Sequence, residues 1–203
     1  MVDNGEPTGD AVFTIGHSNH SLETFLSLLS AHAIEVVVDT RSQPYSRYST
    51  QFNGDALAVE LTKSDIKYLF MGNELGGRPK QEHFYDDEGH VLYSRLAQSD
   101  LFLEGIDRVE KGMSKYRVAL MCSEEDPTVC HRYLLIGRVL KERGARIQHI
   151  RGDGRLQIDE ELESHQSPKD DGQLLLFEEP KETPWRSLRS VLPKSRQPSS
   201  FKP

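Results

Sequence analysis

The sequence predicts an α/β fold: a single domain with a mostly parallel sheet of five strands, flanked by helices in a Rossmann-like three-layer arrangement. Two kinds of segment, which alternate along the chain, predict it. Short apolar runs rich in β-branched residues alternate along the chain with segments in which apolar residues recur at helical spacing. Such alternation is typical of parallel strands, which need crossover helices between them. We expect the domain to span residues 11–152, where the alternation is seen.

Five segments have the length and the apolar or β-branched content of buried strands. In chain order they are residues 11–15 (AVFTI), 34–39 (IEVVVD), 66–71 (IKYLFM), 117–121 (RVALM) and 145–150 (ARIQHI). The expected helices cover residues 21–32, 53–62, 92–111 and 126 to about 143.

The helices are predicted from their internal pattern and their ends. The first has leucine and phenylalanine at helical spacing, and Glu23 in its first turn suits the helix dipole. The second places Leu57 and Leu61 on one face, and the third has apolar residues at helical spacing along most of its length. The last begins with Asp126 as an N-cap before a proline and ends before Gly144.

Both ends of the chain differ from the domain in composition. Residues 153–203 have the composition of a largely disordered tail, and residues 1–10 that of a flexible N-terminus. The last 24 residues are basic, with six Lys or Arg and one Glu, although the net charge of the chain is −7. Because an acidic domain is a poor general surface for a phosphate backbone, we expect any contact with nucleic acid to come from this basic tail.

The sequence also argues against two classes of protein. No apolar run approaches the roughly 20 residues of a membrane span, so we expect no membrane association. The N-terminus, MVDNGEPTGD, is acidic and has no apolar stretch, so it is not a secretory signal. We therefore expect a cytoplasmic location, where the two cysteines stay reduced. The sequence does not indicate an oligomeric state.

Glycines and reactive side chains follow four of the predicted strands. They are Gly16, His17 and Ser18 after the first strand, Asp39 and Arg41 after the second, Gly76 and Gly77 after the third, and Cys122 and Glu124 after the fourth. Open parallel sheets bind ligands at the carboxyl ends of their strands, so convergence on this edge predicts a functional site. The same residue types also favour ordinary turns, which is the alternative.

We divide the candidate site residues by expected role. The expected catalytic residues are His17, Asp39, Glu124 and Cys130. The residues expected to bind a substrate or its anionic group are Arg41, Arg132, His131, Gly16, Ser18, Gly76, Gly77 and Cys122. Two alternatives stay open: Asp39 and Arg41 form a buried ion pair, and His17 is a loop histidine hydrogen-bonded to the backbone.

Both cysteines lie in one stretch, CSEEDPTVCHR, at residues 122–132. In a catalytic interpretation a thiol or Glu124 acts on the substrate, and the start of the following helix lowers the pKa of Cys130. In a metal interpretation Cys122, Cys130 and His131 are three ligands of a zinc ion, although their spacing matches no common paired-cysteine zinc motif. In a structural interpretation the cysteines are buried and the arginine behind them pairs with an acidic side chain. We predict no cofactor, with zinc as the alternative.

The predicted tail contains an apolar island, QLLLF. Its residues Gln173, Leu174, Leu176 and Phe177 resemble the peptide that bacterial proteins use to dock on the DNA polymerase sliding clamp. We expect this segment to bind the clamp, or alternatively to form a last strand or a latch on the domain.

Four motifs, in this order, resemble the domain of unknown function 488 family: FTIGHSNHSLETFL, VVVDTRSQPYSR, YLFMGNELGGRP and CSEEDPTVCHR. The matching elements are TIGHS at residues 14–18, Asp-x-Arg at Asp39 and Arg41, LGG at residues 75–77, Cys-x-Glu at Cys122 and Glu124, and Cys-His-Arg at residues 130–132. The resemblance covers residues 13–151. It implies an α/β domain with a site at these residues, and it implies no particular reaction.

Together these observations predict an enzyme that holds a small anionic ligand at the sheet edge and acts on a nucleotide or a nucleic-acid base, in DNA repair or maintenance. A hydrolase or transferase reaction fits such a site. Two alternatives remain: a non-catalytic nucleotide-binding or clamp-associated adaptor, and a metal- or redox-responsive protein that uses Cys122 and Cys130.

Overall fold

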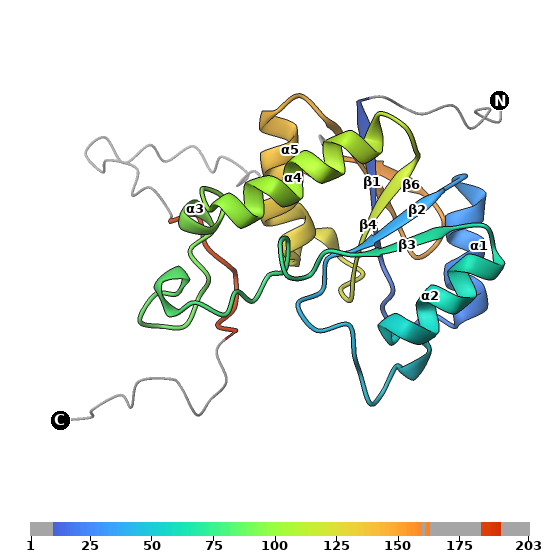
Figure 1. Ribbon diagram of the computed structural model, residues 1–203, viewed down its shortest axis with the longest axis horizontal. Helices are drawn as coiled ribbons and strands as arrows, with labels where there is room; N and C mark the ends of the chain where they lie inside the picture. Colours follow the sequence, from blue (N-terminus) through green and yellow to red (C-terminus); the bar gives the residue numbers. More distant parts are fainter. Residues whose placement is uncertain (1–9, 160, 163–183, 192–203) are drawn as a thin grey trace, which may run out of the picture.

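The computed structural model describes residues 10–159, 161–162 and 184–191 (Figure 1). Its centre is a six-stranded sheet in the order β3-β2-β4-β1-β5-β6. The strands are β1 (Ala11–Gly16), β2 (Val36–Asp39), β3 (Lys67–Phe70), β4 (Val118–Cys122), β5 (Arg146–Ile150) and β6 (Leu156–Ile158). β1 to β5 pair in parallel and β6 pairs antiparallel with β5, which confirms the predicted α/β class.

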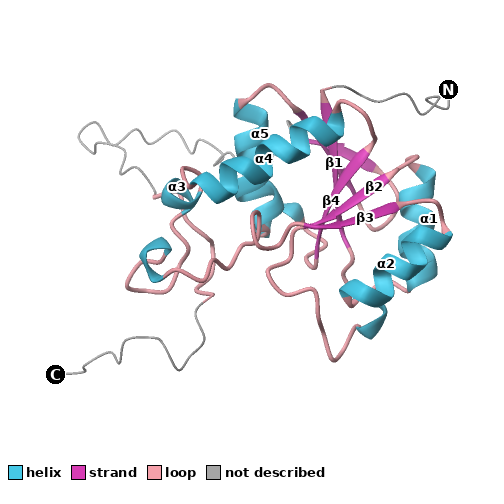
Figure 2. Ribbon diagram, viewed as in Figure 1, coloured by secondary structure: helices cyan, strands magenta, loops and turns pink. Residues whose placement is uncertain are grey.

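Helices cover both faces of the sheet (Figure 2). They are α1 (Leu22–Ala31), α2 (Gly54–Lys63), α3 (Tyr93–Leu96), α4 (Asp100–Met113) and α5 (Arg138–Glu142). Four short helical turns complete the described elements: η1 (Thr50–Phe52), η2 (Glu82–Phe84), η3 (Pro127–Val129) and the π-helical η4 (Arg132–Gly137). Ser21 caps α1 by accepting a hydrogen bond from the backbone N–H of Thr24 at 3.1 Å.

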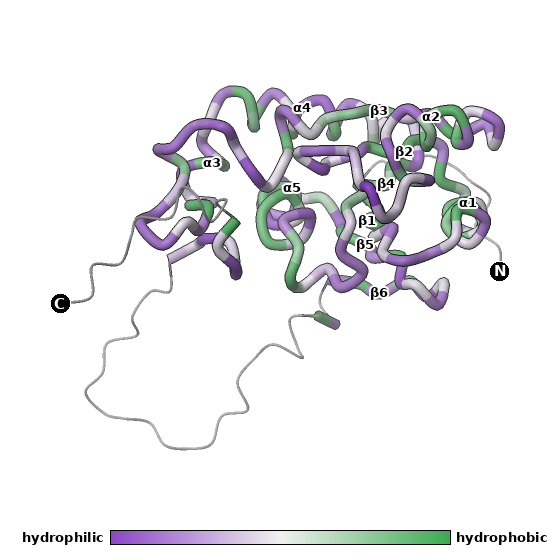
Figure 3. The backbone as a smooth tube through the Cα atoms, turned by 90° about the horizontal axis from the view of Figure 1, so that it is seen from below, coloured by the Kyte–Doolittle hydropathy of each residue, from purple (hydrophilic) through white to green (hydrophobic). Residues whose placement is uncertain are grey.

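The alternation of side chains along the strands divides the core in two. Phe13 and Val37 point to one face, where they pack in a cluster with α1 and α2. Val12 and Val38 point to the other face, where they pack with α4 and η4–α5. Hydrophilic and hydrophobic residues alternate along α4 (Figure 3), as expected for a helix with one face on a sheet.

Strand β4 lies between β1 and β2, and this placement builds the site. Gly16 pairs with Cys122, and Asp39 pairs with Met121. The carboxyl ends of β1, β2 and β4 therefore lie side by side, with those of β1 and β2 on either side of Cys122. The edge predicted to carry the site is thus formed by three strands that are far apart in the sequence.

Two predicted helices are each divided in the structure. The segment predicted as one helix over residues 92–111 is α3 followed by α4. Asp126 caps a helical turn as predicted, because its Oδ1 accepts from the backbone N–H of Thr128 at 2.9 Å. That turn is only η3, however, and it ends at Cys130, whose backbone is extended (φ −114°, ψ 142°). Cys130 therefore lies between η3 and the helical segment that begins at His131 and continues through η4 and α5.

Two segments that the composition places in the tail are part of the structure. Residues 156–158 form β6, which joins β5 through a hairpin in which Gly154 has a φ of +85°. Residues 184–191, which we call the strap, lie beside α3, where Leu92 and Arg186 form an antiparallel bridge. The strap also contacts η4, because Trp185 Nε1 donates to the Leu134 carbonyl at 2.8 Å. The Arg138 guanidinium lies 4.2 Å from the Trp185 ring centroid. Trp185 thus anchors the strap together with Val191, which packs on the core, and Arg186, which forms an ion pair with Asp86.

The QLLLF motif at residues 173–177 lies outside the described residues, so its proposed clamp contact stays a prediction. Among the residues that are described, no helix is long and apolar enough to cross a membrane.

Candidate functional site

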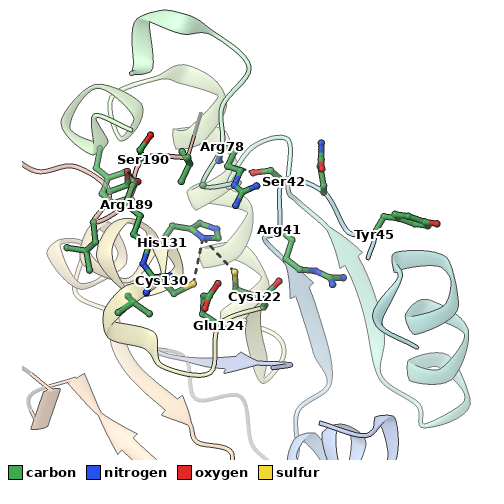
Figure 4. Close-up of a pocket in the computed structure, with 18 residues that line it drawn as sticks. Arg41, Ser42, Tyr45, Arg78, Cys122, Glu124, Cys130, His131, Arg189 and Ser190 are labelled. Atoms are coloured by element: carbon green, nitrogen blue, oxygen red, sulfur yellow. Dashed lines mark hydrogen bonds between the residues drawn. The ribbon is translucent and has the colours of Figure 1, made fainter. Parts of the chain in front are cut away.

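A pocket of about 360 Å³ lies at the carboxyl ends of β2 and β4 (Figure 4). Its walls come from four segments and Tyr93. The segments are the chain after β2 (residues 41–43 and 45), the loop after β3 (77–78), the stretch after β4 (122–124 and 129–131) and the strap (187–191). A second pocket of about 340 Å³ shares the walls formed by Arg41, Tyr45 and Glu124, and adds His17 and Ser18. Both volumes lie in the range of small-molecule sites.

Asp39 holds Arg41, which lines both pockets, from behind. Arg41 donates from Nε to Asp39 Oδ1 at 2.9 Å and from Nη2 to Asp39 Oδ2 at 2.6 Å. The Tyr68 hydroxyl also donates to Asp39 Oδ2, at 2.8 Å. Burial acts to lower the pKa of Arg41, but its hydrogen bonds with Asp39 and the charge of that carboxylate raise the pKa overall. The geometry matches the buried ion pair that the sequence left open, and the carboxylate is already fully engaged.

His17 is held between a backbone carbonyl and Arg41. Its Nδ1 lies 3.0 Å from the Ser18 carbonyl oxygen, which only accepts, so Nδ1 carries the proton. Its Nε2 then accepts from Arg41 Nη1 at 3.1 Å. The ring stacks on Phe52 with centroids 4.4 Å apart. Burial, followed by the charge of Arg41, lowers the pKa of His17, so the imidazole is neutral and positions Arg41.

Cys122, Cys130 and His131 form a cluster at the floor of the pocket. His131 Nδ1 lies 3.7 Å from Cys122 Sγ and 3.7 Å from Cys130 Sγ. His131 Nε2 donates to the Thr40 carbonyl at 3.0 Å. Both cysteines are buried and free of disulfide. The sequence spacing counted against a metal, but the fold brings the three ligand atoms within 4.8 Å of one another.

The sequence predicted a lowered pKa for Cys130, but in the structure it is Cys122 whose pKa is lowered. A hydrogen bond with Cys130 lowers the pKa of Cys122 well below its ordinary value, with help from His131 and Arg132 and against the effect of burial. Burial and the neighbouring Cys122 raise the pKa of Cys130 well above its ordinary value. The prediction that a helix start lowers the pKa of Cys130 is therefore wrong, because burial and Cys122 outweigh the effect of the helical segment that begins at His131.

Arg132 lies behind the pocket instead of lining it. Its guanidinium is buried and donates to the carbonyls of Glu124 and Glu125, the latter at 2.6 Å. Its Nε donates to the Thr14 hydroxyl at 3.3 Å. The structure thus replaces the expected anion contact of Arg132 with a structural one: it fixes the loop that carries Glu124. The Glu124 side chain is exposed to solvent and lines both pockets.

The three candidate glycines are close-approach positions. A Cβ on Gly16 would lie 1.9 Å from the Glu124 carbonyl oxygen, and one on Gly76 would lie 2.2 Å from the Gly72 oxygen. A Cβ on Gly77 would lie 2.8 Å from Cγ of the His131 ring. Only Gly77 lines the main pocket. These glycines let the loops pack on one another and on the histidine ring.

Several lining residues were absent from the predicted set. Arg78 and Arg189 are exposed at the main pocket, and Tyr45, 71% exposed, lines both pockets. Arg78 follows the LGG element at a strand end, which is a signal that could have identified it. Arg189 lies in the segment predicted to be disordered, where only the single tryptophan four residues earlier indicated an anchor.

The structure thus sorts the predicted residues into two groups. Those at the pockets are Arg41, Gly77, Cys122, Glu124, Cys130, His131, His17 and Ser18. Those not among the residues lining the two pockets are Gly16, Asp39, Gly76 and Arg132.

Comparisons with known proteins give one match. The family model "Domain of unknown function DUF488" matches residues 21–139, a range that contains the Asp-x-Arg, LGG and Cys-x-Glu motifs. No curated protein and no solved structure matches the chain. The family match covers more than half of the 203 residues. The chain belongs to the domain of unknown function 488 family.

Proposed function

We propose that this protein is an enzyme that acts on a nucleotide or a nucleic-acid base and binds its substrate in the two joined pockets. The observation that carries the proposal is that two exposed arginines, Arg78 and Arg189, line a pocket whose floor holds two thiols and an imidazole, while the guanidinium of Arg41 is held by Asp39 and His17. Arginine clusters of this kind suit phosphate groups because each guanidinium can donate two parallel hydrogen bonds.

The ion pairs of these arginines, and the lack of them, support an anionic ligand. Arg41 is neutralised by Asp39. Among the described residues, neither Arg78 nor Arg189 forms an ion pair. Two uncompensated positive charges at a pocket of an acidic protein favour a compact anion over a long phosphate backbone. A free nucleotide fits this description better than duplex nucleic acid.

Tyr45 supports the presence of a base in the ligand. Its ring is 71% exposed and lies where the two pockets meet. Exposed aromatic side chains beside basic groups commonly stack on nucleobases, at about 1–3 kcal/mol per base. We place the phosphate at the arginines of the main pocket and the base against Tyr45.

Glu124 is the proposed acid–base group. It is a carboxylate that lines both pockets, and its loop is held by Arg132 through backbone carbonyls, which leaves the side chain for the substrate. His17 and Asp39 are engaged with Arg41 and act as positioning residues. We propose a hydrolase or transferase reaction in a reducing cytoplasm, consistent with two free cysteines.

Titration calorimetry with nucleoside monophosphates, the matching nucleosides and inorganic phosphate tests this proposal. Arg78→Ala and Arg189→Ala should each weaken nucleotide binding by about tenfold or more, the cost of a lost charge-assisted hydrogen bond. Arg155→Ala is the control, because Arg155 is an exposed arginine that lines neither pocket. Tyr45→Ala should weaken binding of the nucleotide and leave that of inorganic phosphate unchanged.

The same panel can overturn the proposal. Nucleosides that bind as tightly as nucleotides would remove the role of the arginines. If the wild type converts one of these nucleotides, Glu124→Gln should bind that nucleotide with unchanged affinity but no longer convert it. A variant that keeps full turnover would show that Glu124 is not the acid–base group.

A further inference from the structure

We propose that Cys122, Cys130 and His131 are the protein ligands of a Zn²⁺ ion whose fourth coordination position faces the main pocket. The site itself does not depend on the proposed function. Its use in catalysis does rest on that function, and the experiments below separate the two.

The distances between the ligand atoms fit tetrahedral zinc. With Zn–S bonds of about 2.3 Å and Zn–N bonds of about 2.0 Å, sulfur and nitrogen ligands of a tetrahedral site lie about 3.5 Å apart. Both sulfurs lie 3.7 Å from His131 Nδ1, and all three ligand atoms lie within 4.8 Å of one another. The two sulfur–nitrogen distances therefore lie about 0.2 Å from the tetrahedral value.

The arrangement around Nδ1 fits an ion better than two hydrogen bonds. The other ring nitrogen, Nε2, donates to the Thr40 carbonyl, so a neutral His131 has a single lone pair at Nδ1. Only one thiol can direct a good hydrogen bond into this lone pair, and the other is left with the neighbouring sulfur, a weak acceptor. Two thiolates and one imidazole lone pair converging on a common point are what a metal ion requires.

The surroundings of His131 are those of a metal ligand. Histidines that bind metals almost always donate the second ring nitrogen to a backbone carbonyl or a carboxylate, as His131 does to Thr40. Thr40 is itself fully buried, and its hydroxyl donates to the Met121 carbonyl at 2.9 Å. On the other side, Gly77 lies so close that a Cβ would meet the ring. The ring orientation is therefore fixed from two sides.

The position of the cluster leaves room for a fourth ligand. All three residues line the main pocket, and Figure 4 shows their side chains turned towards one another beside Glu124. Two cysteines and one histidine leave a water or substrate position on zinc, the pattern of catalytic rather than structural sites. Zinc-dependent nucleobase deaminases use this donor set together with a glutamate that is not a ligand. Glu124, two residues after Cys122, is the group that would exchange a proton with the bound water.

The chain contains its own negative control. Asp86, Glu88 and His90 also bring three candidate ligand atoms within 4.8 Å. There the carboxylates are already occupied, because Arg186 Nη1 lies 2.5 Å from Asp86 Oδ2 and 3.0 Å from Glu88 Oε2. Of the two candidate clusters among the described residues, the acidic one is thus already paired with an arginine, whereas neither cysteine forms an ion pair.

The test uses the full chain, expressed without a histidine tag, purified under reducing conditions and analysed for metals by mass spectrometry. We expect close to one zinc per chain. The metal-free protein, titrated with Co²⁺, should develop the visible bands of tetrahedral cobalt and a thiolate-to-cobalt charge-transfer band. Cys122→Ser, Cys130→Ser and His131→Gln should lose the metal, whereas His90→Asn should retain it. Gly77→Ala should bind Zn²⁺ about tenfold or more weakly, because it displaces the His131 ring.

Because a cysteine variant can also fail to fold, the wild-type chain carries the decision. If folded, reduced, metal-free wild type does not compete with a chromophoric chelator for Zn²⁺, and its two thiols react equally fast with and without Zn²⁺, the proposal is wrong. Zinc binding that survives in Arg78→Ala while nucleotides fail to bind the wild type would overturn the proposed function and leave the metal site standing. Nucleotide binding without zinc binding would do the reverse.

Discussion

Arg41 holds both carboxylate oxygens of Asp39, at 2.9 and 2.6 Å, in a place where the two side chains are 6% and 0% exposed. Removing one partner of such a pair leaves a buried charge uncompensated. We expect Asp39→Asn to lower the free energy of unfolding by about 3–5 kcal/mol, measured by urea denaturation. Tyr68→Phe removes one hydrogen bond to the same carboxylate and should cost about 1 kcal/mol. A cost for Asp39→Asn no larger than that of Tyr68→Phe would contradict the structural role of the pair.

Two glycine substitutions should have opposite effects on stability. Gly77→Ala places a methyl group 2.8 Å from the His131 ring, so the ring or the loop must move, and we expect a loss of about 1–3 kcal/mol. A Cβ on Gly112, in α4, would make an ordinary van der Waals contact with Val118 Cγ2 at 3.6 Å. Gly112→Ala should therefore stabilise the protein by about 0.5–1 kcal/mol through helix propensity. Thermal melts of the two variants beside wild type would show the difference, and equal shifts would argue against the tight approach at Gly77.

The attachment of the strap and the ligand binding by its Arg189 should respond to different substitutions. Trp185→Ala removes a hydrogen bond to Leu134 and the contact with Arg138, so we expect the strap to loosen, at a cost of about 2 kcal/mol, while Arg186 keeps its ion pairs with Asp86 and Glu88. Arg189→Ala should leave the strap in place and change ligand binding alone. Limited proteolysis between residues 184 and 191 distinguishes the variants: faster cleavage is expected for Trp185→Ala only. Equal cleavage of both would mean that Trp185 is not an anchor.

His149 should make stability depend on pH. It is 1% exposed, with Nδ1 2.7 Å from the Thr14 hydroxyl and Nε2 3.5 Å from Asp159. Burial is the main reason that its pKa is lowered from 6.5, and the charge of Arg132 acts in the same direction. The unfolded chain therefore binds this proton more readily, and stability falls as the pH falls from about 6.5 towards the lower pKa of the folded protein.

Urea midpoints measured from pH 7.5 down to pH 5.5 check this expectation, and each unit by which the pKa is lowered is worth about 1.4 kcal/mol. His149→Asn cannot take up the proton and keeps a polar group beside Thr14. Its stability should fall less steeply over the same range. Parallel curves for the variant and wild type would assign the pH dependence to other groups.

The QLLLF segment gives a prediction that concerns a partner. If Gln173, Leu174, Leu176 and Phe177 dock on the sliding clamp, the full chain should bind purified bacterial clamp, and the double variant Leu176→Ala and Phe177→Ala should not. Leu188→Ala, at an exposed leucine of the strap, is the matched control. Clamp binding that is equal in the double variant and in wild type would remove the docking hypothesis.

The sequence was a good guide to the sheet because buried strands and covering helices leave periodic patterns. The ends of the predicted runs 11–15, 34–39 and 117–121 could be placed at one edge without any structure, since parallel strands end on the same side. β6 and the strap could not be predicted in this way. Each is short and follows a polar stretch, and each is held by contacts with distant residues, such as that of Trp185 with Leu134.

The roles of the site residues were harder to predict than their location. Nothing in the order of residues shows that Arg132 turns inwards to the carbonyls of Glu124 and Glu125, or that Arg41 takes the lone pair of His17. A spacing of eight residues between the cysteines matches no common motif, yet a short turn with an extended end folds Cys130 back beside Cys122. Such close approaches depend on backbone geometry that composition and periodicity do not encode.

The central position of β4 has a consequence for biosynthesis. β1 and β2 share no hydrogen bonds, and each meets the other half of the sheet only through Val118–Cys122. While the ribosome is still making the first 117 residues, β1 and the β2–β3 pair are therefore unconnected edges, and neither cysteine has yet been added. The thiols, the glutamate and the histidine arrive together with the strand that joins the halves. A chain that stops before β4 thus lacks all three proposed metal ligands, and the capture of a metal ion would report that β4 has joined the two halves of the sheet.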